Sequence, residues 1–272
     1  MRTLWKGAIS FGLVNIPIKM YSATERKQIS FNQLHASCKT PVQYRKYCPA
    51  CQIEVGPDEI VRGYEYEKGR YVVLRDEDFE LLPGENTKTV DILDFVNLSE
   101  IDPVYYDKTY YLEPNPGGEK AYALLKTAMQ ETGKIAIARV MIRSKSALAC
   151  IRVLGELLAI ETMYFPDEIR SAETLTTQIK KPELHPNEIS MAKSLIENLS
   201  SHFQPEKYSD EYRAKLMEVI QAKIAGEEVA IPTAPETAKV IDLMEALRAS
   251  LEATEKKEPQ TPAKKGKKKK IG

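Results

Sequence analysis

Two spacings of apolar residues divide this chain. From the N-terminus to about residue 170, apolar side chains tend to alternate with polar ones, which is the period of half-buried strands. In the first strand Val14, Ile16, Ile18 and Met20 share one face. The same reasoning predicts a hairpin over residues 60–75 and strands over residues 91–96, 105–112, 134–143, 147–154 and 157–165.

Helical spacing appears once within this region and dominates after Pro166. A helix is predicted over residues 119–131, which contain Ala, Leu, Lys and Met and are followed by Gly133 as a C-terminal cap. Further helices are predicted over residues 188–203, capped by Asn187, and 210–225, capped by Ser209. The pattern therefore favours a fold that is mainly β with α.

The composition then divides the chain into four parts. A β-rich core is expected over residues 1–170 and a helical arm over 171–226. Pro232 and Pro235 place a linker before a short amphipathic helix, and together these occupy residues 227–254. Residues 255–272 are mostly Lys, Pro, Gly and Thr, so they lack apolar surface to bury and are predicted to be disordered.

The zero net charge conceals an uneven distribution. Eight of the 39 basic residues lie in the last part of the chain, against two glutamates there. An unstructured lysine run binds phosphate through counterion release without reading bases. We therefore predict DNA contacts from Lys264, Lys265, Lys267, Lys268, Lys269 and Lys270. A solubilising tail or a localisation signal has the same composition.

Three of the four cysteines lie within fourteen residues. The pattern is His35-x2-Cys38-x9-Cys48-x2-Cys51, so two pairs of donors could complete a closed tetrahedral set of three thiolates and one imidazole. This spacing predicts a structural zinc site in an insertion over residues 35–51. Two alternatives stay open: plain packing of the cysteines, and a redox-active Cys-x-x-Cys, which no thioredoxin-like pattern surrounds.

The amphipathic helix, predicted over residues 238–252, carries a single apolar stripe made of Val240, Leu243, Met244, Leu247 and Leu251. Because a proline linker separates it from the core, this stripe could enter a groove on a partner protein. It could equally fold back on the body of the same chain.

Motifs typical of catalysis do not occur in the sequence. It contains no phosphate-binding Gly-x-x-x-x-Gly-Lys-Ser/Thr, no His-Glu-x-x-His and no Gly-x-Ser-x-Gly. The acidic run Asp76-Glu77-Asp78 could bind a divalent cation, but a solvated loop or helix start is the simpler interpretation. We therefore expect a protein that is not an enzyme. With no apolar run long enough to span a membrane, we also expect it in the cytoplasm, associated with the nucleoid.

Several segments, taken in order, resemble the bacterial Ku family over nearly the whole chain. They are RTLWKGAISFGLVNIP at residues 2–17, IVRGYEY at 60–66, EIDP at 100–103, GGEKAY at 117–122, IAIAR at 135–139, and Tyr212-Arg213. The number and order of these segments carry the resemblance, since no single one is decisive.

The resemblance implies a Ku-type β-barrel in a homodimeric ring around duplex DNA. Such a ring reaches linear DNA by threading over an end, without sequence specificity, and recruits and stimulates ligase D in the non-homologous end-joining repair of double-strand breaks. Recruitment is expected through the amphipathic helix. The N-terminal seventy residues carry eleven basic and six acidic side chains, so candidates for the ring lining are Lys6, Arg26, Lys27, Arg45 and Lys46, with Arg143 and Lys145 at a strand end.

Three other interpretations are compatible with the sequence. A general DNA-coating protein held by its lysine tail would bind circles and linear fragments equally. An enzyme of nucleic-acid metabolism would convert DNA on its own with a divalent metal. A zinc-knuckle scaffold would bind only proteins.

Overall fold

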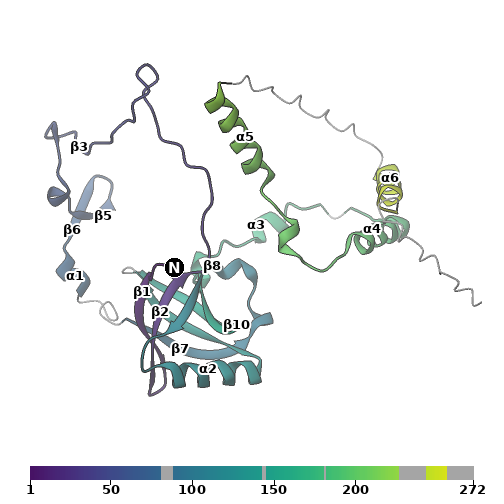
Figure 1. The fold of residues 1–272 in the computed structure, drawn as a ribbon, viewed down its shortest axis with the longest axis horizontal. Helices are drawn as coiled ribbons and strands as arrows, with labels where there is room; N and C mark the ends of the chain where they lie inside the picture. The colour runs from purple at the N-terminus through teal and green to yellow at the C-terminus, as the bar shows by residue number, and fades with distance from the viewer. Residues whose placement is uncertain (81–87, 143–144, 181, 227–242, 256–272) are drawn as a thin grey trace, which may run out of the picture. The chain divides into compact units, whose positions relative to one another are not determined.

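The chain forms two compact units, Met1–Ala172 and Glu173–Gly272, each of which is described here by itself. A computed structural model describes residues 1–80, 88–142, 145–180, 182–226 and 243–255 (Figure 1). None of the described helices has the length and apolar character that crossing a membrane would require.

Seven strands of the first unit close into a barrel, which confirms the predicted β-barrel core. In barrel order they are β1 (Trp5–Phe11), β2 (Val14–Ser22), β8 (Tyr106–Pro114), β11 (Leu157–Met163), β10 (Lys145–Leu154), β9 (Lys134–Ile142) and β7 (Thr89–Asn97). Six neighbouring pairs are antiparallel, whereas β1 and β7 pair in parallel and complete the ring of strands. Across the described residues of both units, helices and strands occupy similar shares.

Alternating side chains of these strands fill the barrel. Ile16, Ile18 and Met20 are buried as predicted, while Val14, which the same pattern placed with them, is 44% exposed at the start of β2. On β11 both faces are buried, because the interior covers one side and the loop containing Ile101 and Tyr105 covers the other. The turn at Gly155 joins β10 to β11 with a φ of 56°, which a glycine adopts without strain.

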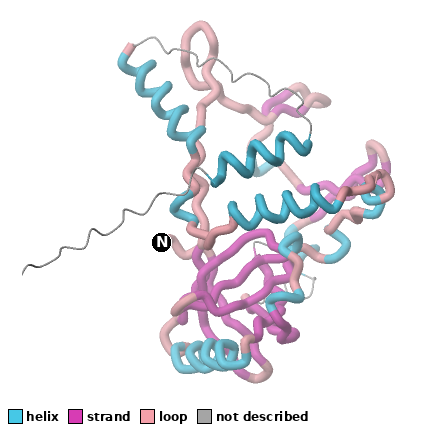
Figure 2. Tube along the Cα trace, turned by 90° about the vertical axis from the view of Figure 1, so that its right-hand side faces the viewer, coloured by secondary structure: helices cyan, strands magenta, loops and turns pink. Residues whose placement is uncertain are grey.

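Helix α2 (Glu119–Thr132) covers one open end of the barrel (Figure 2). Its buried side chains Tyr122, Leu125 and Met129 join the interior cluster, and Gly133 ends it in the left-handed conformation, as the sequence predicted. The Tyr122 hydroxyl donates to the Leu112 carbonyl oxygen at 2.7 Å and accepts from the Leu158 N–H at 2.7 Å. Since Leu112 and Leu158 face each other on β8 and β11, this hydroxyl fixes the helix to the seam between two strands.

Between β2 and β7 the chain leaves the barrel and later returns to it. This excursion, residues 23–88, contains two small sheets and a short helix: β3 (Tyr47–Cys48) with β4 (Ile53–Glu54), β5 (Arg62–Glu67) with β6 (Arg70–Leu74), and α1 (Asp76–Glu80). The predicted hairpin over residues 60–75 is therefore confirmed. None of residues 23–79 is buried, so this part of the excursion has no core of its own.

The second unit is helical. It contains α3 (Glu173–Thr176), α4 (Pro186–Leu199), α5 (Glu211–Ala225) and α6 (Leu243–Glu255). Turns of 3-10 helix complete the described structure of both units at Pro57–Glu59, Leu98–Glu100, Pro103–Tyr105, Pro166–Glu168 and Pro205–Lys207. Helix α6 packs against α4 (Figure 1).

Both predicted caps in this unit were wrong by one or two residues. Helix α4 begins at Pro186, and the Glu188 carboxylate accepts from the backbone N–H of His185, the residue at the cap position. At α5 the side chain of Asp210, and not of Ser209, accepts from the Arg213 N–H. Asp210 also places a negative charge at the positive end of the α5 dipole.

We expect Tyr122→Phe to destabilise the barrel by about 1–3 kcal/mol, because the buried Leu158 N–H would lose its acceptor. The measurement is urea unfolding, followed by the fluorescence of Trp5, the single tryptophan of the chain, which packs against the core. Tyr64→Phe is the control, since that side chain is 64% exposed. Equal midpoints for the two variants would contradict the bridging role of the Tyr122 hydroxyl.

Candidate nucleic-acid interface

The barrel end opposite α2 opens into a cavity of about 900 Å³. It is formed where β1, β8 and β10 begin and where β2, β9 and β11 end, and Trp5, Met20 and Met163 form part of its apolar wall. We call this cavity the barrel mouth. Its charged lining consists of Arg26, Lys108 and Lys145 together with Asp107 and Glu168.

The mouth therefore brings together two basic residues that the sequence proposed as DNA contacts, Arg26 and Lys145. The other described candidates, Lys6, Lys27, Arg45 and Lys46, are exposed but do not line this cavity. Arg45 forms an ion pair with Glu54 at 2.7 Å. Lys6 lies on β1, but the residue of this strand that lines the mouth is its neighbour Trp5. Arg143 and Lys264, Lys265, Lys267, Lys268, Lys269 and Lys270 lie outside the described residues.

Lys108 is a cation of the mouth that the sequence analysis missed. It lies opposite Thr162 in the pairing of β8 with β11, and its amine is 3.8 Å from the Asp107 carboxylate. Both side chains are well exposed, so this ion pair is weak and leaves Lys108 available to phosphate. The register of two strands far apart in sequence places Lys108 here, and the local pattern contains no sign of it.

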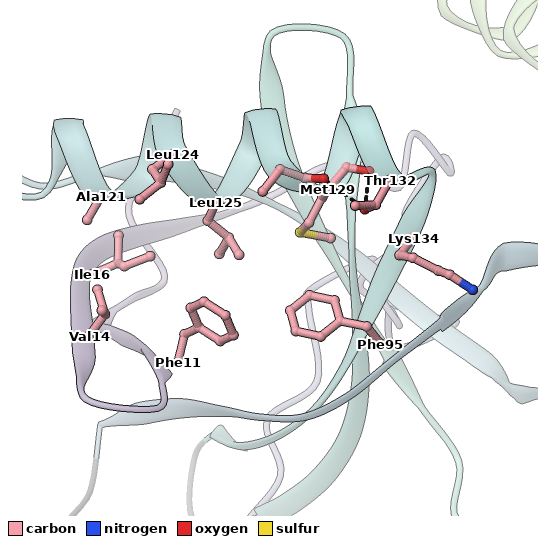
Figure 3. Close-up of a pocket in the computed structure, with 11 residues that line it drawn as sticks. Phe11, Val14, Ile16, Phe95, Ala121, Leu124, Leu125, Met129, Thr132 and Lys134 are labelled. Carbon is pink, nitrogen blue, oxygen red and sulfur yellow. Dashed lines mark hydrogen bonds between the residues drawn. The ribbon is translucent and has the colours of Figure 1, made fainter.

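A second cavity, of about 300 Å³, lies between α2 and the barrel (Figure 3). Phe11 and Phe95 meet edge to face in it, with ring centroids 5.6 Å apart. Lys134 is its one ionisable lining residue among those described, and its amine donates to the Asn97 side-chain oxygen at 2.9 Å. Apart from Lys134 and Thr132, the lining of this groove is apolar.

The four predicted metal donors form two separate pairs. The Nδ1 atom of His35 lies 3.1 Å from the Cys38 Sγ, and the side chains of Cys48 and Cys51 interact with each other. Within the described ranges, no three His, Cys, Asp or Glu side chains are grouped in a way that could hold a metal ion. The His35–Cys38 pair and the Cys48–Cys51 pair therefore do not form one tetrahedral site in this structure.

The environments of the thiols differ strongly. Hydrogen bonds from Thr40 and His35 lower the pKa of the exposed Cys38 thiol to about 7. Burial in the barrel wall, beside the Glu161 carboxylate, raises the pKa of Cys150 to about 12. Glu161 is buried, forms an ion pair with Arg152 at 2.7 Å and accepts from the Cys150 thiol at 3.3 Å. Cys150 is thus a core residue, as the sequence predicted.

The apolar stripe of the amphipathic helix faces α4 in this structure. Met244, Leu247 and Leu251 of α6 are partly buried, as are Met191 and Leu195 of α4. Leu243 is the first residue of α6, and Val240 lies outside the described residues. Helix α6 is therefore packed against another helix of its own unit.

A family model described as the Ku70/Ku80 beta-barrel domain matches residues 10–191 of this chain. A protein of Symbiobacterium thermophilum named "Non-homologous end joining protein Ku" is 59% identical over 257 residues, or 94% of this chain and 64% of that protein. Two proteins of the same name, from Desulfitobacterium hafniense and Bacillus subtilis, are 48% and 46% identical. These matches each cover 97% of this chain, with 92% and 86% of the respective relatives.

At pH 8 and in the presence of a metal chelator, iodoacetamide should modify Cys38 well before Cys150. A thiol with a pKa of about 7 is mostly thiolate at this pH, whereas one with a pKa of about 12 stays protonated and is also buried. Peptide mass spectrometry over a time course measures both rates in one sample. Similar rates at the two positions would contradict the environments described above.

Proposed function

The chain belongs to the Ku family, and we propose that it binds the ends of linear double-stranded DNA in non-homologous end joining. In this proposal two copies form a twofold ring that DNA enters by threading, and the protein catalyses no reaction itself. It acts on the chromosome in the cytoplasm. The names of its relatives and the form of the excursion support this function.

The excursion is the observation that carries the proposal. Residues 23–88 leave the barrel after β2 and rejoin it at β7, so both ends of the segment are anchored. The hairpin of β5 and β6 exposes Tyr64, Tyr66, Tyr71, Val72 and Val73, each between 46% and 64% accessible. Apolar surface of this extent needs a partner. A second copy of the chain offers the same surface and closes a symmetric ring.

The charges of the barrel mouth support binding without sequence specificity. Arg26, Lys108 and Lys145 are long, exposed cations that can follow a phosphate backbone. Contacts to phosphate position a duplex without reading its bases, and their strength falls steeply with salt. A factor that must accept any broken end requires this kind of contact.

Ligase D is the proposed downstream partner, recruited through α6. The stripe on this helix fits an apolar groove, and its packing against α4 leaves two routes to binding. The ligase either takes the place of α4 or docks on the surface that α4 and α6 build together. Both routes depend on Leu247, which is partly buried between the helices.

Competition between DNA forms tests end binding. A labelled linear duplex bound at physiological salt should be displaced by unlabelled linear DNA and not by covalently closed circles, because a ring needs an end. Equal displacement by circles would replace the proposal with general DNA coating. Conversion of the DNA by the protein with a divalent metal would indicate an enzyme instead.

The double variant Arg26→Glu/Lys145→Glu tests the mouth. Its affinity for linear DNA should fall about tenfold or more for all sequences alike. The slope of log affinity against log salt concentration should also decrease, by the amount that about one to two phosphate contacts contribute. Lys120→Glu is the control, since it changes an exposed charge on α2, away from the mouth. If the control weakens binding as much as the double variant, the mouth is not the DNA-contacting surface.

The double variant Leu243→Glu/Leu247→Glu should abolish stimulation of ligase D while end binding survives. The control, Ala249→Glu, introduces the same charge at an exposed position of the same helix. Ligase stimulation and DNA binding are measured in parallel on each protein. Unchanged stimulation by the double variant would refute the assignment of α6.

A further inference from the structure

The two donor pairs of the excursion lie in turns of the same conformation. In each, a donor is followed three residues later by a cysteine, and the next residue has a positive φ: 57° at Lys39 and 57° at Gln52. Throughout the described ranges, these are the only residues other than glycine with a positive φ. The left-handed conformation is uncommon for such side chains, so its occurrence at two equivalent positions requires a shared cause.

The hydrogen bonds of the turns match as well. The Lys39 N–H donates to the His35 carbonyl oxygen at 2.8 Å, and the Gln52 N–H donates to the Cys48 carbonyl oxygen at 2.9 Å. Each turn is closed by antiparallel pairing, Leu34 with Pro41 and Cys48 with Ile53. The sequence thus folds the same knuckle twice, once with a His–Cys pair and once with a Cys–Cys pair.

Within the first knuckle, the two donor atoms are close to the spacing that one metal ion requires. In a tetrahedral zinc site a nitrogen and a sulfur ligand are separated by roughly 3.6 Å, which follows from the usual bond lengths. His35 Nδ1 and Cys38 Sγ lie 3.1 Å apart, so a small adjustment brings both onto one metal. Three sulfurs and one imidazole form a donor set that suits Zn²⁺.

Nothing else in the surroundings accounts for these turns. The residues from 23 to 79 include none that is buried, so core packing does not impose the left-handed backbone. Leu34 and Ile53, which lie next to the knuckles, are each at least half exposed. A segment of this kind gains its order from a metal or a partner, and metal binding contributes directly to folding.

We propose that the two knuckles close on one Zn²⁺, held by His35, Cys38, Cys48 and Cys51 of the same chain. Each knuckle supplies two ligands, and a closed structural site needs four. The nine residues between Cys38 and Cys48 can span about 30 Å, which allows the separate turns to meet. The ion would hold together residues 35–51 of the excursion. This inference does not depend on DNA binding.

The metal content of the full-length chain tests the site. Protein produced with added zinc and purified under reducing conditions should retain about one zinc per chain by mass spectrometry of the metal. Cys38→Ser and Cys48→Ser should each lose most of it, whereas Cys150→Ser, which removes a buried thiol of the barrel, should keep it. The absence of zinc from the parent protein, or equal loss in the Cys150 control, would overturn the proposal.

Two further measurements on the parent protein avoid variants that fail to fold. Co²⁺ added to the chelator-treated protein should give the intense visible bands of a tetrahedral thiolate site, saturating at one ion per chain. Zinc should also slow tryptic cleavage at Lys39, Arg45 and Lys46 while leaving cleavage at Arg213 unchanged. Saturation at one ion per two chains, a Cys48–Cys51 disulfide in freshly reduced protein, or unchanged cleavage would each rule out closure within one chain.

Discussion

The parallel pairing of β1 with β7 is the constraint on which the remaining structure depends. Ala8, Ile9 and Ser10 face Thr89, Val90 and Asp91, and the Ala8 N–H donates to the Lys88 carbonyl oxygen at 2.9 Å. A Cβ at Gly7 would lie 2.1 Å from that oxygen, so only glycine allows the approach. Because β2 runs antiparallel to β1 and β7 runs parallel to it, β2 ends at the same end of the barrel where β7 begins. The excursion therefore leaves and rejoins the barrel at the same end, and the pairing of β7 with β1 fixes where it returns.

Residues 23–79 of the excursion include no buried residue, so they have to be ordered by something outside themselves. Their two proposed stabilisers act on different parts. A second copy of the chain would cover the apolar hairpin of β5 and β6, and zinc would hold the knuckles that contain His35 and Cys48. Both meet the same physical need, because conformational entropy opposes an extended segment that buries no side chain.

Local patterns predicted the elements of the fold, but they could not predict which charged residues the fold brings together. Alternation found the strand containing Ile16 and Ile18, and Gly133 marked the end of α2, since both signals act within a few residues. The barrel mouth is different. Lys108 and Lys145 meet because β8, β10 and β11 adopt one particular register, which depends on contacts distant in sequence, and Arg26 joins them from the segment after β2. The packing of α6 on α4 is equally non-local.

The charge of the mouth bears on how the proposed ring would hold DNA. Three cations share the cavity with Asp107 and Glu168, so the net attraction for phosphate at this surface is small. Counterion release at the three cations would still make the affinity fall with salt, while the two carboxylates would limit its size. A closed ring does not need a high electrostatic affinity for DNA, because a threaded duplex escapes only through its end. Weak contacts with phosphate then allow the ring to move along the DNA while its topology prevents loss.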